Sequence, residues 1–413
     1  MSELSYLEKL LDGAEVEWKA LGDVAGYSST RIDADKIDAT SFIGVDNLIA
    51  DKGGRIDATY LPNTTRITAY EQGDILLGNI RPYLKKVWMA TNSGGCSGDV
   101  LAIRISEDYK KCIRPEYLYY LLSSNAFFSY NMQHSKGAKM PRGSKGAILN
   151  YRIPILCPEN PKKSLAIQSE IIRILDSFNA LTAELTAELT ARKKQYNYYR
   201  DQLLSFKEGE VEWKTLEEIG HIVTGRTPKS SDKSAWGDDV DFVTPSDIKN
   251  GMRNITCPSR RLSAEGAASM PKVRIPSGSL LVTCIGADMG KTVINTNDCI
   301  PNQQINAITL TDDSVQVGYL FHVLTAMRET LRRQGELGGG TMPLINKSDF
   351  SKIVVPVPSY EEQNRIATTL DKFDALTNSI TEGLPREIAL RQQQYEYYRD
   401  LLFSFPKPDA VSQ

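Results

Sequence analysis

Several signatures of enzymes and membrane proteins are absent from this chain of 413 residues. The six cysteines are scattered without a C-x-x-C pair, and the three histidines show no ligand spacing, so neither a zinc site nor a disulfide framework is expected. No apolar run approaches the roughly 18 residues that a membrane span needs. The N-terminal segment MSELSYLEKLLDG is too charged for a signal peptide. These absences predict a protein of the reducing cytoplasm.

Charge of one sign is also lacking. The chain has 49 basic and 51 acidic side chains and a formal net charge of −2. This balance argues neither for nor against nucleic acid, because any basic footprint must then be local. The length favours two or more domains, each with a core of its own.

What the sequence does contain is an internal repeat. KQYNYYRDQLLSF (194–206) returns as QQYEYYRDLLFSF (393–405), with nine of the thirteen positions identical. Four more pairs keep the same order: VEWKALGDV (16–24) with VEWKTLEEI (211–219), QGDILLGNI (72–80) with SGSLLVTCI (277–285), GAKMP (137–141) with GGTMP (339–343), and LDSFNALT (175–182) with LDKFDALT (370–377). The chain is therefore two copies of a unit of about 200 residues.

The repeat is circularly shifted. YLEKLLDGAEVEW (6–18) looks like a shortened copy of YRDQLLSFKEGEVEW (199–213), so a fragment of the helical tail precedes the first unit. We expect a closed, near-symmetric arrangement in which this N-terminal fragment completes the end left open at the C-terminus.

Each unit has a variable part followed by a closely copied helical part. Short β-branched runs punctuated by glycine and proline predict mixed α/β domains at 15–160 and 208–358. Residues 161–207 and 359–405 read as long helices, with a short N-terminal helix at 1–14 and a tail at 406–413. The predicted fold is mixed α/β, with two repeated domains and two long helices.

Apolar residues in the two helices follow a heptad seam, which favours packing of one helix on the other. The alternative is that each helix only covers the core of its own domain. The second helix carries four extra residues, and Gly383 and Pro385 within TEGLPRE (381–387) predict a break there. The predicted seam positions are Leu175, Phe178, Leu185, Leu189, Tyr196, Tyr199, Leu203, Phe206, Leu370, Phe373, Ile380, Tyr395, Tyr398, Leu402 and Phe405.

Two stretches come close to catalytic motifs without matching them, and a third motif is absent. GADMGKT (286–292) has only three residues between its glycines, one fewer than a phosphate-binding loop requires. Asp247 and Lys249 could belong to a magnesium-dependent nuclease, but the first unit has no matching lysine. The Asn/Asp-Pro-Pro-aromatic loop of amino-methylating DNA methyltransferases does not occur. We expect no catalytic site and no metal site in this chain.

Local clusters of basic residues in the variable parts are candidate DNA contacts, since Arg and Lys bind phosphates and guanine edges. The alternative for each cluster is an ordinary solvated surface. The candidates are Arg81, Lys85, Lys86, Lys136, Lys139, Arg142 and Lys145 in the first unit, and Arg226, Lys229, Lys249, Arg253, Arg260, Arg261, Arg332 and Arg333 in the second.

The whole chain resembles the DNA-specificity (S) subunit of type I restriction–modification enzymes. The paired Q-x-x-I to YYRD helices carry the resemblance, supported by GDILLGNIRPYLKK, PNQQINAI and the two M-P turns. The tandem TAEL (182–189) and the segment ITEGLPREIALRQQQYEYYRDLLFSFPKP look like the IC subgroup.

The resemblance implies that each variable domain reads one half of a bipartite DNA target. It also implies that the two long helices form an antiparallel coiled coil that separates the two domains. It further implies that two methyltransferase (M) subunits and restriction (R) subunits assemble with the chain. S-adenosylmethionine, ATP and Mg²⁺ would act only in those partners. Tyr198, Arg200, Tyr397 and Arg399 lie off the seam and are candidate contacts to the M subunits.

Two other functions stay open at this point: a stand-alone two-headed DNA-binding regulator, and a self-contained nuclease that uses Asp247. The seam also suggests a ruler. The 32 residues from Leu175 to Phe206 span roughly 48 Å, more than the 34–36 Å of one duplex turn. Removing one TAEL unit would shorten this ruler by about 6 Å.

Overall fold

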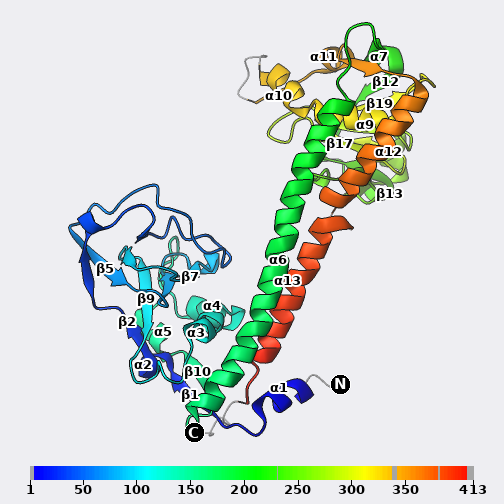
Figure 1. The fold of residues 1–413 in the computed structure, drawn as a ribbon. Coiled ribbons are helices and arrows are strands. Elements are labelled where there is room, and N and C mark those ends of the chain that lie inside the picture. Colours follow the sequence, from blue (N-terminus) through cyan, green and yellow to red (C-terminus); the bar gives the residue numbers. More distant parts are fainter. Residues whose placement is uncertain (1–3, 230, 337–341, 380–381, 407–413) are drawn as a thin grey trace. The chain divides into compact units, whose positions relative to one another are not determined.

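The computed structural model describes residues 4–229, 231–336, 342–379 and 382–406. The chain forms two compact units (Figure 1). Unit 1 is Met1–Leu181 with Arg391–Gln413, and unit 2 is Thr182–Leu390. One boundary falls inside α6 (Pro161–Leu203) and the other inside α13 (Gly383–Leu402), so each unit contains one α/β region and parts of both helices. In the described part of the chain, no helix combines the length and apolarity of a membrane span.

Unit 1 contains two four-stranded sheets, with strand orders β2-β9-β6-β7 and β3-β5-β8-β4. Its strands are β1 (Val16–Ala20), β2 (Ala25–Tyr27), β3 (Arg31–Asp33), β4 (Phe42–Ile43), β5 (Arg66–Tyr70), β6 (Ile75–Gly78), β7 (Val87–Met89), β8 (Gly94–Cys96), β9 (Val100–Ile105) and β10 (Arg152–Leu156). Its shorter helices are α1 (Leu4–Leu11), α2 (Leu21–Val24), η1 (Ala34–Lys36), η2 (Pro82–Leu84), α3 (Pro115–Leu122), α4 (Asn125–Gln133) and α5 (Lys145–Asn150).

Unit 2 repeats this plan with a five-stranded sheet, β12-β19-β16-β17-β14, and a three-stranded sheet, β15-β13-β18. Its strands are β11 (Glu212–Thr215), β12 (Gly220–Thr224), β13 (Trp236–Val243), β14 (Asn254–Ile255), β15 (Arg260–Leu262), β16 (Leu280–Thr283), β17 (Thr292–Asn295), β18 (Cys299–Pro301), β19 (Ile305–Leu310) and β20 (Val354–Val357). Its shorter helices are α7 (Leu216–Ile219), η3 (Pro245–Asp247), α8 (Ala264–Ala268), η4 (Pro271–Val273), α9 (Val317–Ala326), α10 (Arg328–Glu336), α11 (Lys347–Ser351) and α12 (Tyr360–Thr377).

A separate two-stranded antiparallel ribbon closes each α/β region. β1 pairs with β10 in unit 1, and β11 pairs with β20 in unit 2. A buried tyrosine locks each ribbon to a helix: Tyr117 donates to the Pro154 carbonyl at 3.2 Å, and Tyr319 donates to the Pro356 carbonyl at 3.0 Å. The repeat seen in the sequence is therefore a repeat of packing as well.

The predicted break in the second helical segment is confirmed. α12 ends at Thr377 and α13 begins at Gly383, whose φ of +73° is a conformation that glycine adopts without strain. A side chain at Gly383 would collide with the Ala375 carbonyl oxygen, because an added Cβ would lie 2.3 Å from it. Glycine is thus required where the helix stops and restarts.

Aromatic stacks join the helices, and they repeat in the two units. In unit 1 the Phe178 ring stacks on Tyr398, with 5.3 Å between centroids. In unit 2 the Phe373 ring stacks on Tyr199 at 5.7 Å. Early residues of α6 therefore meet the end of α13, while late residues of α6 meet α12. This order is that of the predicted antiparallel coiled coil.

Segments near both ends of the described chain come together in unit 1, as the circular repeat predicts. Leu7 and Leu11 of α1 share a buried core with Leu402 and Phe405. The Trp18 indole N–H donates to the Pro406 carbonyl at 2.8 Å. The N-terminal fragment thus packs against the C-terminal helix end.

The seam residues divide by position along the helices. Those next to an α/β region join its core: Leu175, Leu402 and Phe405 in unit 1, and Tyr196 and Leu370 in unit 2. Those at the edges of these cores are half-buried: Leu203, Phe206, Phe373 and Tyr395. Phe178, Leu185 and Leu189 are half-buried, Tyr199 and Tyr398 are 41% and 42% exposed, and Ile380 lies outside the described residues. Both interpretations of the seam therefore apply, each to different residues.

Candidate nucleic-acid interface

A buried glutamine fastens each long helix to its α/β region. Gln168 accepts from the Arg114 backbone N–H at 2.8 Å and donates to the Cys112 carbonyl at 2.7 Å. Gln363 repeats both bonds, from the Gln316 N–H at 2.9 Å and to the Ser314 carbonyl at 2.8 Å. These are the glutamines of the Q-x-x-I motif. Their backbone partners Arg114 and Gln316 directly precede α3 and α9, so these bonds fix each α/β region on its helix.

Two basic clusters that are distant in the sequence of unit 1 lie together in the structure. The turn at 137–141 folds back on the strand end after β6, because the Arg81 N–H donates to the Pro141 carbonyl at 2.8 Å. Lys136 and Arg142 exchange two backbone hydrogen bonds of 2.9 Å across this turn. Arg81, Lys136, Lys139 and Arg142 have exposed side chains, which makes one cationic surface of the predicted residues.

Several basic candidates of unit 1, including Arg142 of this surface, already have partners. Lys85 Nζ donates to Asn125 Oδ1 at 3.1 Å, and Lys86 Nζ donates to the Val45 carbonyl at 2.6 Å. Arg142 pairs with Asp99 at 3.2 Å. Lys145 Nζ lies 5.9 Å from the centre of the Tyr27 ring, a cation–π contact.

Arg81 and Lys85 have left-handed backbones, with φ of +51° and +49°. Their counterparts in the repeat are Gly286 and Gly290, with φ of +84° and +78°. A left-handed non-glycine residue costs about 1–2 kcal/mol. Unit 1 therefore keeps two cations in a turn whose backbone favours glycine, which is typical of functional sites.

The basic candidates of unit 2 divide into exposed and engaged residues. Arg226, Lys229, Lys249 and Arg333 are exposed. Three arginines form ion pairs within the unit: Arg253 with Asp371 through two bonds of 2.9 Å, Arg261 with Asp241 at 2.9 Å, and Arg332 with Glu336 at 3.2 Å. The guanidinium of Arg260 lies 3.4 Å from the centre of the Trp236 ring. Their roles in DNA binding stay predictions, and those of Arg253 and Arg261 compete with these internal ion pairs.

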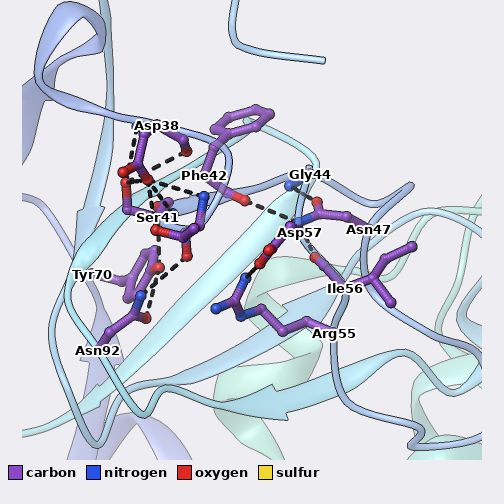
Figure 2. Close-up of polar contacts among 11 residues, drawn as sticks. Asp38, Ser41, Phe42, Gly44, Asn47, Arg55, Ile56, Asp57, Tyr70 and Asn92 are labelled. Atoms are coloured by element: carbon purple, nitrogen blue, oxygen red, sulfur yellow. Dashed lines mark hydrogen bonds and ion pairs between the residues drawn. The ribbon is translucent and has the colours of Figure 1, made fainter. Parts of the chain in front are cut away.

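A polar network that the sequence did not reveal holds the loop after β4 in unit 1 (Figure 2). The Gly44 N–H donates to Asn47 Oδ1 at 2.6 Å, and Asn47 Nδ2 donates to the carbonyls of Phe42 and Ile56 at 2.9 and 3.0 Å. Nearby, hydrogen bonds from Ser41 and Thr40 lower the pKa of Asp38 to about 2. These contacts fix the start of a long loop whose Tyr60 and Leu61 are exposed.

Asp247, the nuclease candidate, is the repeat counterpart of Asn47 and does the same structural work. Its carboxylate accepts from the Thr244 N–H at 2.8 Å and from the Ser259 N–H at 2.9 Å. An amide replaces the carboxylate in unit 1, so the position requires a hydrogen-bond acceptor rather than a charge. Among the described residues, no group of His, Cys, Asp and Glu side chains is arranged to hold a metal ion.

The GADMGKT segment is the turn between β16 and β17. Lys291 Nζ pairs with Asp288 at 2.6 Å and donates to the Ile248 carbonyl at 3.1 Å. Its side chain thus anchors a neighbouring loop, as Lys86 does in unit 1. This placement fits a loop between strands and not a nucleotide-binding motif.

Two of the four predicted partner contacts are clearly exposed: Tyr198 by 62% and Tyr397 by 47%. The Arg200 side chain is 22% exposed and pairs with Asp201 at 2.7 Å. Arg399 departs from the expectation, since its side chain is fully buried. It packs over the Tyr395 ring, with 5.7 Å to the centroid. Burial, and after it the charge of Arg399, lowers the pKa of Lys52. In this conformation Arg399 offers no surface to a partner.

Comparisons with known proteins agree with this geometry. Residues 208–390 match the family model described as the type I restriction modification DNA specificity domain. The chain is 40% identical over 420 residues to the EcoR124I/EcoR124II specificity subunit of Escherichia coli, covering 100% of both chains. It is 34% identical over 399 residues to the EcoprrI specificity subunit of Escherichia coli, covering 92% of this chain and 93% of the relative.

Solved structures share the fold. A chain from a study of complex assembly and conformational transition in the type I restriction–modification system superposes with a TM-score of 0.63 at 20% identity, covering 94% of this chain and 97% of that one. The S subunit from Mycoplasma genitalium gives a TM-score of 0.56 at 13% identity, covering 96% and 98%. The full-length relatives fit the resemblance to the IC subgroup and do not favour a stand-alone regulator. The chain belongs to the specificity subunits of type I restriction enzymes, the non-catalytic components that select the DNA sequence on which the complex acts.

Proposed function

We propose that each α/β region reads one half of a bipartite target, and that the two helices set the number of unread base pairs between the halves. One observation carries the proposal: the scaffold is repeated contact by contact while the candidate reading surfaces differ. The glutamine bonds and aromatic stacks recur in both units. The turns that carry Arg81 and Lys85 do not, since glycines replace both residues.

The partners follow from the same repeat. Two copies of one helix end can bind two copies of one methyltransferase subunit, with Tyr198 and Tyr397 as exposed contacts. Restriction subunits would complete the assembly in the cytoplasm, where the DNA is. S-adenosylmethionine, ATP and Mg²⁺ would be bound by these partner subunits, and this chain would bind none of them.

The experiment is a domain exchange. Residues 15–160 are replaced by the corresponding segment of another specificity subunit, and the DNA of cells with the assembled system is sequenced for methylated adenines. We expect a new sequence in one half-site, the old sequence in the other, and an unchanged spacer. A change in both halves would contradict independent reading.

The spacer has its own test. Deleting one TAEL repeat from 182–189 shortens α6 by about 6 Å, so the preferred spacer should change by about one or two base pairs with both half-sites intact. Insertion of a third TAEL is the matched control and should change the spacer in the opposite direction. An unaltered spacer in both variants would contradict the ruler.

A further inference from the structure

Unit 2 contains a cavity of about 420 Å³ between the end of α6 and the α/β region. Its wall is rich in cations that come from four different elements. The basic residues are Lys193 and Arg200 of α6, Lys249 after η3, Lys291 in the turn between β16 and β17, and Arg328 of α10. Two carboxyl groups line the same wall, Glu329 and Asp374, and burial raises the pKa of Asp374. Arg200 and Lys291 also pair with Asp201 and Asp288, so five cations meet four carboxyl groups and the excess of positive charge is small.

Several donors at this cavity lack an acceptor. Thr292 and Thr325 line the cavity, and their hydroxyl oxygens are buried without a hydrogen-bond partner. Thr292 is only 6% exposed. Lys193 and Lys249 form no ion pair within the described part of the chain. Buried donors that stay unpaired are costly, so their convergence with excess positive charge indicates a missing anionic ligand.

The corresponding place in unit 1 has the same character. Arg399 is the repeat counterpart of Arg200, and one of its terminal nitrogens is buried without a partner. Lys85 and Lys52 are close neighbours of each other and of Arg399, and the backbone N–H of Lys52 donates to the Lys85 carbonyl at 3.0 Å. A cluster of cations at the same point of both repeats points to a ligand that both halves share. Bases differ between half-sites, whereas phosphates do not.

We propose that the cavity of unit 2 is a phosphate-binding site, in which Arg200, Lys249 and Lys291 supply positive charge and Thr325 donates a hydroxyl hydrogen bond. Clustered Arg, Lys and Thr donors match the oxygens of a phosphate group. The group can come from a duplex backbone or from a free phosphate compound. Assignment to the duplex rests on the proposed DNA-reading function, but phosphate binding itself does not. A duplex source would give the helical scaffold, through Arg200, a direct share in DNA binding.

The test uses the full chain and three variants. Thr325→Val removes the unpaired hydroxyl at nearly constant volume, and Lys249→Gln removes a charge that pairs with no described side chain. Lys272→Gln is the matched control, since Lys272 is exposed in the same unit away from the cavity. Thermal unfolding is followed with increasing inorganic phosphate at constant ionic strength. Phosphate should raise the Tm of the wild type and the control by a few degrees and raise that of the two site variants less.

Without phosphate, Thr325→Val should unfold at the wild-type temperature or above, because it removes a buried unpaired hydroxyl. A merely structural threonine would give the opposite result. An equal phosphate response in all four proteins would overturn the proposal. The proposal would also be overturned if the two site variants kept the wild-type response to phosphate but lost binding of the methyltransferase subunit. The cavity would then be a binding site for an acidic surface of that partner.

Duplex binding identifies the source of the phosphate. If the source is the DNA backbone, Lys249→Gln should weaken binding to cognate and non-cognate duplexes equally, by about threefold. The slope of log binding constant against log salt concentration should fall by about one in magnitude. If duplex binding is unchanged while the phosphate response is lost, the ligand is a free phosphate compound, which still supports the site. A wild-type complex that binds no duplex would contradict the proposed function, yet the thermal measurement would still decide on the cavity.

Discussion

The two units have left-handed backbone conformations at equivalent turns, but with different residues. Every described residue of unit 2 with φ between +20° and +160° is a glycine, including Gly251, Gly286 and Gly290. At the equivalent points unit 1 has Asp51, Arg81 and Lys85. In unit 1 the turn at Asp51 is bonded to the turn between Arg81 and Lys85, because the Asp51 N–H donates to the Leu84 carbonyl at 2.9 Å. Unit 2 therefore has unstrained glycines at these turns, whereas unit 1 has charged residues in a strained backbone conformation.

This difference distinguishes residues that hold the helical scaffold from residues that are candidates for reading DNA. Gln168 and Gln363, or Phe178 and Phe373, are the same residue in the same contact because both copies must hold identical helices. Under the proposed function, the turns differ because each unit reads different bases. A position is therefore expected to act on folding or assembly where the units agree, and on sequence preference where they differ.

The largest effect is expected at the shared glutamines. Gln168→Ala and Gln363→Ala each leave a backbone N–H without its acceptor and remove a donor from a carbonyl, although the Cys112 carbonyl keeps the Ser164 hydroxyl at 3.2 Å. Each change should lower the free energy of unfolding by about 2–4 kcal/mol. Urea unfolding measures the loss. The two losses should be similar, and Gln→Glu should not restore stability because its carboxylate cannot donate to the carbonyl. A loss in only one unit would break the comparison.

The aromatic stacks should give the next largest effect. Phe178→Ala and Phe373→Ala remove half-buried rings, at about 1–3 kcal/mol each. Phe373→Ala should also lose the contact of its ring with the buried Tyr196, whose ring centre lies 6.3 Å away. Leu substitutions serve as controls that keep apolar area without the stack. Equal losses in the Ala and Leu variants would mean that the stacks contribute little.

The strained turns should give a smaller change in stability but a clear change in function. Arg81→Gly relieves a left-handed backbone and should leave the free energy of unfolding unchanged or raise it by up to about 1 kcal/mol. Selection in the first half-site should fall at the same time. Gly286→Ala is the reverse control and should destabilise unit 2 by about 1 kcal/mol. If Arg81→Gly loses stability, the turn is structural and not a reader.

The sequence predicts what depends on periodicity and local turn chemistry. The repeat, the break at Gly383 and the meeting of the chain ends all follow from residues that are close in sequence or copied. Three features did not follow: the buried role of Gln168, the approach of the 137–141 turn to Arg81, and the burial of Arg399. Each depends on a segment far away in the chain. Arg200 and Arg399 occupy identical YYRD motifs, yet only Arg399 is fully covered, because the covering turns differ between the units.

The smallest effect concerns Lys52, whose repeat counterpart is Met252. Burial, followed by the charge of Arg399, lowers the pKa of Lys52 from 10.5 to about 8. The unfolded chain therefore binds this proton more tightly, so the free energy of unfolding should rise as the pH increases from about 8 to 10.5. Lys52→Met makes unit 1 resemble unit 2 at this point and should remove that rise, worth about 1 kcal/mol or less after solvent screening. Urea unfolding of both proteins across this range measures the difference, with Lys272→Gln as the control. If the free energy of unfolding changed with pH in the same way for the wild type and Lys52→Met, Lys52 would not be affected by its cationic neighbours. The two units would then be electrostatically alike at this turn.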